Sequence, residues 1–296
     1  MEFGVLGPLE VRLGAHALAL PARERTLLAA LLLGAGRVVS VDRLVSSLWG
    51  HESPPSALNS LQAYVSRLRA RLRCGTDDSP TIRTWSNGYQ LELGTARFDL
   101  ADFRAHVEAA RQARATGDLA GAARSYARAL ELWRGEPLLD VQSSYLVQTY
   151  AAGIEEGYLT ALEEYTDTRL ALGEHRLLIG ELEDLVARWP LRERFVAQLA
   201  TALQRNGRTV EALTMVGTTR RRIAEEYGLD PSAELVRLEL DLLRSAVTDP
   251  GRALQPFYVE VGGTGTPLSP GDLLGLLQWM QIAGRRVRLV VDEDAG

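Results

Sequence analysis

Polar and basic residues line one side of a predicted helix near residue 60, where their types would suit contact with nucleic acid. Residues 54–72, PPSALNSLQAYVSRLRARL, carry apolar residues at steps of three and four: Leu58, Leu61, Val65, Leu68 and Leu72. This spacing is typical of an amphipathic helix with one buried face. On a helical wheel, the other residues form a small, polar and positive outward face with two flanks. That face and its flanks comprise Ser56, Asn59, Ser60, Ala63, Ser66, Arg67, Arg69, Ala70, Arg71 and Arg73.

Such a face could enter the major groove of DNA. Small side chains allow close approach, Asn and Ser hydrogen-bond to base edges, and arginine reaches guanine or phosphate. We expect a base contact from Arg67, because it projects furthest from the buried stripe, and then from Asn59, Ser60, Ala63 and Ser66. We expect phosphate contacts from Arg69, Arg71, Arg73 and Arg83. A solvated amphipathic helix without a binding role would show the same periodicity. The flanking sequence must therefore decide between a DNA-binding helix and an ordinary surface helix.

The flanking sequence predicts a winged helix. Residues 2–20 alternate short apolar runs with turns, which indicates a small antiparallel sheet. Helices are predicted over 22–33 and 41–49, the second capped by Ser40, with a short strand at 38–39 between them. After the amphipathic helix of residues 54–72, TIRTW and GYQLEL are predicted to form a hairpin around residues 86–88. This order of elements is that of a winged helix with an extra N-terminal sheet.

The second half is predicted to be helical almost throughout, in seven or more paired helices. Gly173 and Gly207 lie 34 residues apart, the period of a tetratricopeptide repeat. The apolar and aromatic stripes of these helices are best explained as packing. The expected fold class is therefore mainly α: a winged helix-turn-helix over 1–95, an all-α tetratricopeptide-like domain over 96–247, and an extension of unknown role, with a strand, helix, strand pattern, over 248–296.

Charge is distributed unevenly along the chain. The net charge is −5, and all 33 basic residues are arginine. Residues 1–75 carry nine arginines against five acidic residues, a balance of +4, whereas residues 96–249 carry nineteen against twenty-five, a balance of −6. A basic module joined to an acidic one is typical of a nucleic-acid binder. No signal peptide or membrane span is evident, so we expect a cytoplasmic protein.

No motif points to catalysis, a cofactor or a metal. The glycine-rich GGTGTP at 262–267 lacks the lysine of a phosphate-binding loop, and the four histidines are scattered. Cys74 is the single cysteine, so no disulfide framework is expected. We expect neither an enzyme nor a cofactor-binding protein.

Several segments, taken in order, resemble one known family. FGVLGPLEV, RTLLAALLLGAGRVVSVDRLVSSLWG, the Pro-Pro pair, LQAYVSRLRARL and GYQLEL resemble the DNA-binding domain of the Streptomyces antibiotic regulatory protein family, whose winged helix is of the OmpR type. ALELWRGEPLLD, ELEDLVARWPLRERFVAQLATALQRNGRTVEAL and EEYGLDPSAEL resemble the family's bacterial transcriptional activator domain. The resemblance covers about residues 1–247. It departs at Trp85 in the wing, and residues 250–296 fall beyond the family's common part.

The resemblance implies a role for each half of the chain. Residues 56–73 would be the recognition helix, with Asn87 at the wing tip. The protein would be a transcriptional activator of a secondary-metabolite (antibiotic) gene cluster that binds direct repeats in double-stranded promoter DNA, self-associates there and recruits RNA polymerase holoenzyme. The alternative is a protein-interaction scaffold whose helical domain binds a peptide or regulator.

Overall fold

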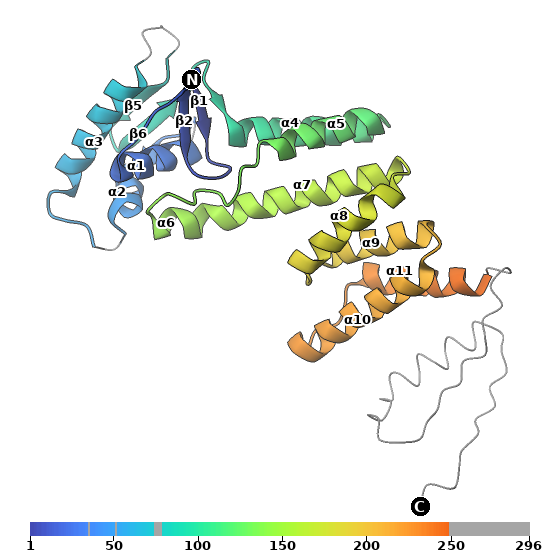
Figure 1. Ribbon diagram of the computed structural model, residues 1–296. Helices are drawn as coiled ribbons and strands as arrows, with labels where there is room; N and C mark the ends of the chain where they lie inside the picture. The colour runs from blue at the N-terminus through green and yellow to red at the C-terminus, as the bar shows by residue number, and fades with distance from the viewer. Residues whose placement is uncertain (35, 51, 74–78, 249–296) are drawn as a thin grey trace, which may run out of the picture. The chain divides into compact units, whose positions relative to one another are not determined.

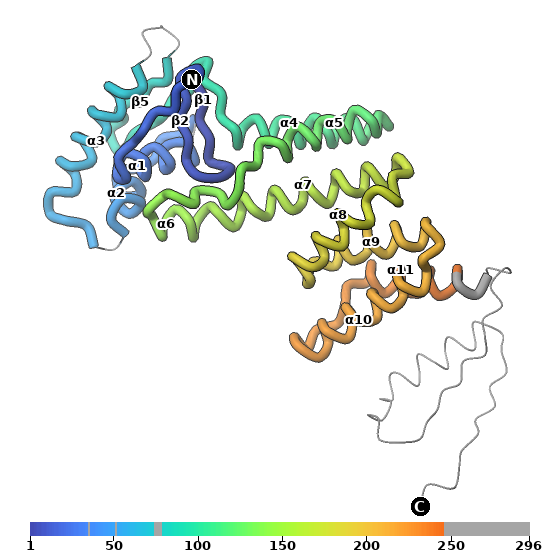
Figure 2. The backbone as a smooth tube through the Cα atoms, in the orientation of Figure 1, coloured from blue at the N-terminus to red at the C-terminus, as the bar shows by residue number. Residues whose placement is uncertain are grey.

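The computed structural model describes residues 1–34, 36–50, 52–73 and 79–248 (Figures 1 and 2). The chain divides into two compact units, Met1–Leu172 and the part that begins at Gly173. We call them unit 1 and unit 2. Cys74, the loop at 262–267 and the strand, helix, strand pattern predicted after residue 248 lie outside the described residues.

Unit 1 opens with a small sheet that the sequence predicts only in part. Its strand order is β3-β2-β1-β7. β2 pairs antiparallel with both β1 and β3, as predicted, whereas β7 pairs parallel with β1. Parallel pairing requires a long crossover, which here is the entire winged helix. The strands are β1 (Glu2–Gly4), β2 (Glu10–Leu13), β3 (His16–Ala17) and β7 (Arg97–Phe98).

The winged helix that follows confirms the predicted order of elements (Figure 1). The Ser40 side chain caps the second helix by accepting a hydrogen bond from the Arg43 backbone N–H at 3.3 Å. A second sheet has the order β4-β6-β5, antiparallel throughout. The elements are α1 (Ala22–Leu33), β4 (Val39–Ser40), α2 (Val41–Trp49), α3 (Ala57–Leu72), β5 (Thr81–Trp85) and β6 (Gly88–Glu92).

The helices after the winged helix share its hydrophobic core. One cluster of buried side chains runs continuously from Phe3 in β1 to Ala161 in α7. In the view of Figure 2, α4 and α5 run side by side, and α5 also packs against α7. Unit 1 thus continues past the predicted boundary at residue 95. These helices are α4 (Asp99–Ala115), α5 (Leu119–Glu131), the short α6 (Ser144–Leu146), a π-helical turn (Val147–Ala151) and α7 (Ala152–Ala171).

Unit 2 is a stack of helices in which α9 packs against α8, α10 and α11. Gly173 and Gly207 have positive φ values of 86° and 76°, as does Gly117 between α4 and α5, at 84°. Each glycine ends one helix and leads into the next, where its missing Cβ permits the left-handed turn. The mainly α, tetratricopeptide-like fold class is confirmed. The helices are α8 (His175–Arg188), α9 (Glu193–Arg205), α10 (Thr209–Tyr227) and α11 (Ala233–Thr248).

Tyr126 in α5 is fully buried and couples the stability of unit 1 to pH. Its hydroxyl donates to Glu164 Oε2 at 3.1 Å, and Arg111 Nε lies 2.9 Å from the same oxygen. Burial, and then the negative charge of Glu164, raises the pKa of Tyr126 to about 12 from its usual 10.0. Folding therefore favours the neutral phenol, and this stabilisation is complete below pH 10 and is lost as pH rises toward 12.

We expect the free energy of unfolding to fall by up to about 2.7 kcal/mol between about pH 10 and pH 12. Tyr126→Phe should remove most of that dependence, which urea titrations of both proteins at several pH values would measure. Equal pH dependence of the two proteins would contradict this role for Tyr126.

Candidate nucleic-acid interface

Helix α3 buries a stripe that differs from the predicted one at its first turn. Leu58 is 57% exposed, so its assignment to the buried stripe is wrong. Because Ala57 and Leu61 face the core together, Leu58 turns about 100° away from Ala57 and reaches solvent. The helix thus adds an apolar side chain to its outer face. The buried residues of α3 are Ala57, Leu61, Val65, Leu68 and Leu72.

The outer face of α3 is small and polar, as the sequence predicts. Ser56, Asn59, Ala63 and Ser66 are exposed, and Ser60 is half-buried. Gln62 is exposed as well, although the sequence prediction omits it. The spacing could have revealed it, because Gln62 follows Asn59 by three residues and precedes Ser66 by four. Its amide is of the type that pairs with adenine in the major groove.

Arg67 lies along the helix surface instead of pointing straight away from it. Its guanidinium carbon is 5.1 Å from the centre of the Tyr64 ring, and its Nε donates to the Ala63 carbonyl at 3.4 Å. Arg67 Nη1 is 3.9 Å from Glu24 Oε1 in α1, which places the side chain on the α1 side of α3. Its side chain is nevertheless 58% exposed. A base contact by Arg67 stays a prediction.

Arg69 fastens α3 to the wing. Its Nε donates to the Ile82 carbonyl at 2.8 Å, and its Nη2 donates to Thr84 Oγ1 at 2.7 Å. Both acceptors belong to β5. Arg69 therefore holds α3 against β5, the first wing strand, and only its remaining N–H groups are available for a phosphate.

Arg71, Arg73 and Arg83 differ in how much of their charge is already paired. Arg71 Nε lies 2.8 Å from Glu24 Oε2, and Arg83 Nε lies 2.7 Å from Glu92 Oε2 on the neighbouring wing strand. Arg73 is exposed and has no ion-pair partner among the residues that the structure describes. Within the described residues, the charge of Arg73 is therefore the least compensated of the three. Phosphate contacts by all three stay predictions.

The wing is held to α2 as well as to α3. β5 and β6 join through a tight turn in which Trp85 pairs with Gly88 and Asn87 is exposed. The Asn87 carbonyl accepts from the Val41 N–H at 2.9 Å, which satisfies a free donor in the first turn of α2. A Cβ on Gly88 would lie 2.2 Å from the Val39 carbonyl oxygen, so only glycine lets β6 pair with β4 here.

Trp85, the departure noted in the wing, is half exposed on β5. Its Nε1 donates to Gln90 Oε1 at 2.8 Å, and the Gln90 amide donates to the Gly36 carbonyl at 3.1 Å. The indole is therefore fixed against the wing instead of turning freely. Its polar edge is used inside the protein, and half of its surface faces solvent.

A seam of partly buried polar contacts joins the winged helix to the helices after it. Asp99, in the first turn of α4, accepts from the backbone N–H groups of Val5 and Leu6 at 2.9 and 3.0 Å. Asp140 accepts from the Leu9 N–H at 2.6 Å and pairs with Arg25 of α1. Both carboxylates satisfy donors that the N-terminal sheet leaves unpaired, so the two parts of unit 1 are locked in one arrangement.

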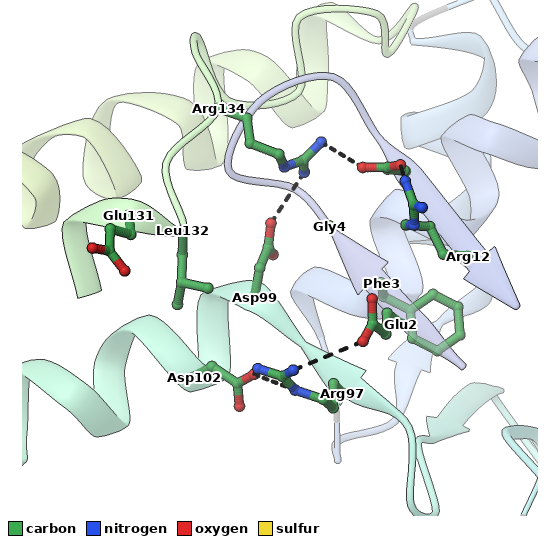
Figure 3. Close-up of a pocket in the computed structure, with 11 residues that line it drawn as sticks. Glu2, Phe3, Gly4, Arg12, Arg97, Asp99, Asp102, Glu131, Leu132 and Arg134 are labelled. Atoms are coloured by element: carbon green, nitrogen blue, oxygen red, sulfur yellow. Dashed lines mark hydrogen bonds and ion pairs between the residues drawn. The ribbon is translucent and has the colours of Figure 1, made fainter. Parts of the chain in front are cut away.

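The same seam borders a cavity of about 230 Å³ (Figure 3). Arg134 reaches Glu10 and Asp99 at 3.1 and 3.2 Å, and Arg97 reaches Asp102 at 3.1 Å. Arg134 comes close to the backbone here because Gly4 has no side chain to obstruct it. Since these charged groups already pair with one another, we assign the cavity to the structure of unit 1 and not to ligand binding.

Residues 1–34, 36–50, 52–73 and 79–248 contain neither a metal site nor a membrane-spanning helix. Among the described residues, no group of three His, Cys, Asp or Glu side chains is arranged to hold a metal ion. None of the helices in those ranges is long and apolar enough to cross a membrane.

Two family models match the chain. Residues 15–91 match the transcriptional regulatory protein, C-terminal family, and residues 98–243 match the bacterial transcriptional activator domain. The first covers α1, α2, α3 and all but the last residue of the wing, and the second covers most of the helices from α4 to α11.

Curated relatives and a solved structure agree with these matches. Regulatory protein DnrI of Streptomyces peucetius is 35% identical over 258 residues, which cover 85% of this chain and 94% of the relative. Regulatory protein AfsR of Streptomyces coelicolor is 39% identical over 247 residues, 83% of this chain but only 24% of the much longer relative.

The solved structure of Mycobacterium tuberculosis EmbR in complex with a low-affinity phosphopeptide superposes with a TM-score of 0.78 at 31% identity. The match covers 82% of this chain and 65% of EmbR. The alignment with DnrI covers 94% of that relative, so both halves of this chain have counterparts in DnrI in the same order. The chain belongs to the Streptomyces antibiotic regulatory protein family, whose members are transcriptional regulators and not enzymes.

Proposed function

We propose that this chain is a sequence-specific transcriptional activator that reads double-stranded promoter DNA through α3 and the β5–β6 wing. One observation carries the proposal: α3 exposes a small, polar face formed by Asn59, Gln62, Ala63 and Ser66, flanked by exposed Arg67 and Arg73. Such residues can approach base edges closely, while arginines at the end of the helix neutralise phosphates. The fastening of the wing to both α2 and α3 supports the proposal, because DNA recognition requires rigid spacing between reading elements.

The first test is a gel shift with the whole chain and the DNA upstream of adjacent biosynthetic genes. We expect a shifted complex at low salt that competitor DNA of scrambled sequence does not remove. Absence of any complex at low salt would contradict the proposal. The similarity to DnrI supports the further proposal that the controlled genes form a secondary-metabolite cluster.

We also propose that the chain binds direct repeats as two or more copies and recruits RNA polymerase holoenzyme. Direct repeats require two winged helices that face the same way, about one helical turn apart on one side of the duplex. Changing the spacing between repeats by half a turn should abolish binding of the second copy. Transcription with purified holoenzyme should rise when the chain is added to a template that carries the repeats and should not rise without them.

Salt dependence separates phosphate contacts from base contacts. If about four arginines meet phosphates, log affinity should fall against log salt with a slope of about −3.6, and Arg73→Ala should reduce this slope by about one unit. Arg67→Ala should instead cost roughly 1 to 3 kcal/mol on the preferred sequence. Arg104→Ala, on an exposed position of α4, is the matched control and should change neither quantity. Equal losses on all sequences for Arg67→Ala would contradict its base-reading role.

The alternative function is a protein-interaction scaffold. The solved EmbR complex contains a phosphopeptide, and the match with this chain covers 65% of EmbR. A protein partner for this chain is proposed by analogy with that complex. A scaffold predicts tight binding of a peptide to the chain and no salt-sensitive complex with DNA. The gel shift described above therefore decides between the two functions.

A further inference from the structure

Glu24 is a charged residue in an unusual place, because it lies in the first turn of α1 with only 2% of its side chain exposed. Burying a carboxylate is costly unless positive charge or hydrogen bonds compensate it. Among the described residues, two cations pair with Glu24, and both come from α3: Arg71 Nε lies at 2.8 Å and Arg67 Nη1 at 3.9 Å. Glu24 Oε2 accepts no aligned hydrogen bond, so its contact with Arg71 is an ion pair.

The guanidinium groups of Arg67 and Arg71 pair with Glu24, yet both side chains remain partly exposed to solvent. Arg71 uses its Nε on Glu24 and remains 39% exposed, and Arg67 remains 58% exposed. Arg67 is further restrained by the Tyr64 ring and the Ala63 carbonyl. The nitrogen of Arg71 that lies 2.8 Å from Glu24 is Nε, and 39% of the Arg71 side chain faces solvent, where a phosphate would bind. The arrangement holds each guanidinium while leaving part of it accessible.

We propose that Glu24 is a positioning residue for DNA recognition, which orients Arg71 directly, and Arg67 more loosely, before DNA is bound. The inference rests on the proposed function. An arginine that is already ordered loses less conformational freedom when it binds a phosphate, so it binds more tightly than a free one. The negative charge of Glu24 acts in the opposite sense, because it partly cancels the attraction of these arginines for DNA. The direction of the effect therefore tests the proposal.

The experiment measures the affinity of the whole chain for a duplex that the wild-type chain selects from a random library. Wild type, Glu24→Gln, Arg71→Gln and the double variant are compared by fluorescence anisotropy, with a thermal unfolding curve for each. We expect Glu24→Gln to weaken binding by about five- to tenfold, from the ordering cost of one or two side chains. In the Arg71→Gln background, the same substitution should weaken binding by no more than about twofold. Unchanged or tighter binding by Glu24→Gln, or effects that simply multiply, would overturn the proposal.

A second variant, Arg71→Lys, tests the proposal even if Glu24→Gln does not fold. Arg71→Lys keeps a positive charge beside Glu24 but lacks a second nitrogen to offer to DNA while the first is held. It should lose most of the affinity that Arg71→Gln loses, and wild-type affinity for Arg71→Lys would overturn the proposal. Failure of the wild-type chain to select or bind any duplex would reject the proposed function itself. That result differs from a wild-type chain that binds and is indifferent to Glu24.

Discussion

A chain cut after residue 95 is expected to be less stable by about 5 kcal/mol or more than a chain cut after Leu172. The shorter chain loses β7, the parallel partner of β1, and the carboxylates of Asp99 and Asp140 that accept backbone hydrogen bonds from the N-terminal sheet. It also exposes apolar surface that Phe98, Leu100 and Phe103 cover in the shared core. Each large apolar side chain contributes roughly 1.5 to 3 kcal/mol when buried, and small domains are stable by only about 5 to 15 kcal/mol in total.

Urea unfolding followed by circular dichroism measures the difference between the two truncated chains. The chain that ends at Leu172 is the matched control, because it stops where the compact unit stops. Equal unfolding midpoints would mean that the winged helix is stable alone and that the seam contributes little.

Asp99→Ala in the whole chain is expected to destabilise unit 1 by about 3 to 5 kcal/mol. The substitution removes the acceptor of two backbone N–H groups and one partner of Arg134. The Asp99 side chain is only 11% exposed, so most of its contacts are with the protein. The loss should appear as a lower unfolding midpoint with little change in the slope of the urea curve.

Asp102→Ala is the control for Asp99→Ala. Asp102 lies three residues further along α4 and pairs with Arg97, which is 64% exposed. Exposed pairs contribute about 0 to 1 kcal/mol, so this variant should unfold almost like the wild type. A loss for Asp102→Ala as large as that for Asp99→Ala would contradict the role given to the buried acceptor.

Periodicity and turn chemistry were sufficient to predict the winged helix and the helical stack. Val41–Trp49 follows its predicted cap at Ser40, and Gly173 and Gly207 end helices at the predicted spacing. The sequence did not reveal β7, because a strand of two residues has no detectable alternation. It also did not show that the winged helix shares its core with α4, α5 and α7, since that depends on contacts between residues more than ninety positions apart, such as Val5 and Asp99.

The sequence predicts which residues lie on the outer face of α3, and their role in binding DNA stays a prediction. A helical wheel predicts the outer face of α3 from the sequence. It does not show which arginines already have partners inside the protein. Arg69 binds β5 and Arg71 binds Glu24, and neither partner is near in sequence. The apolar character of Leu58 favours a place in the core, whereas the turn of the helix carries it to the surface. Side-chain pairing of this kind depends on tertiary structure and has no signature in spacing.

The central claim is that the outer face of α3 reads DNA sequence. The most direct measurement compares the affinity of the wild type and of the triple variant Asn59→Ala, Gln62→Ala, Ser66→Ala for a selected duplex and for a scrambled one. Gln112→Ala, at an exposed position of α4, serves as the control. We predict that the ratio of the two affinities falls at least tenfold, by roughly 1.4 kcal/mol or more, while affinity for the scrambled duplex stays within about twofold. An unchanged ratio in the folded triple variant would contradict the claim.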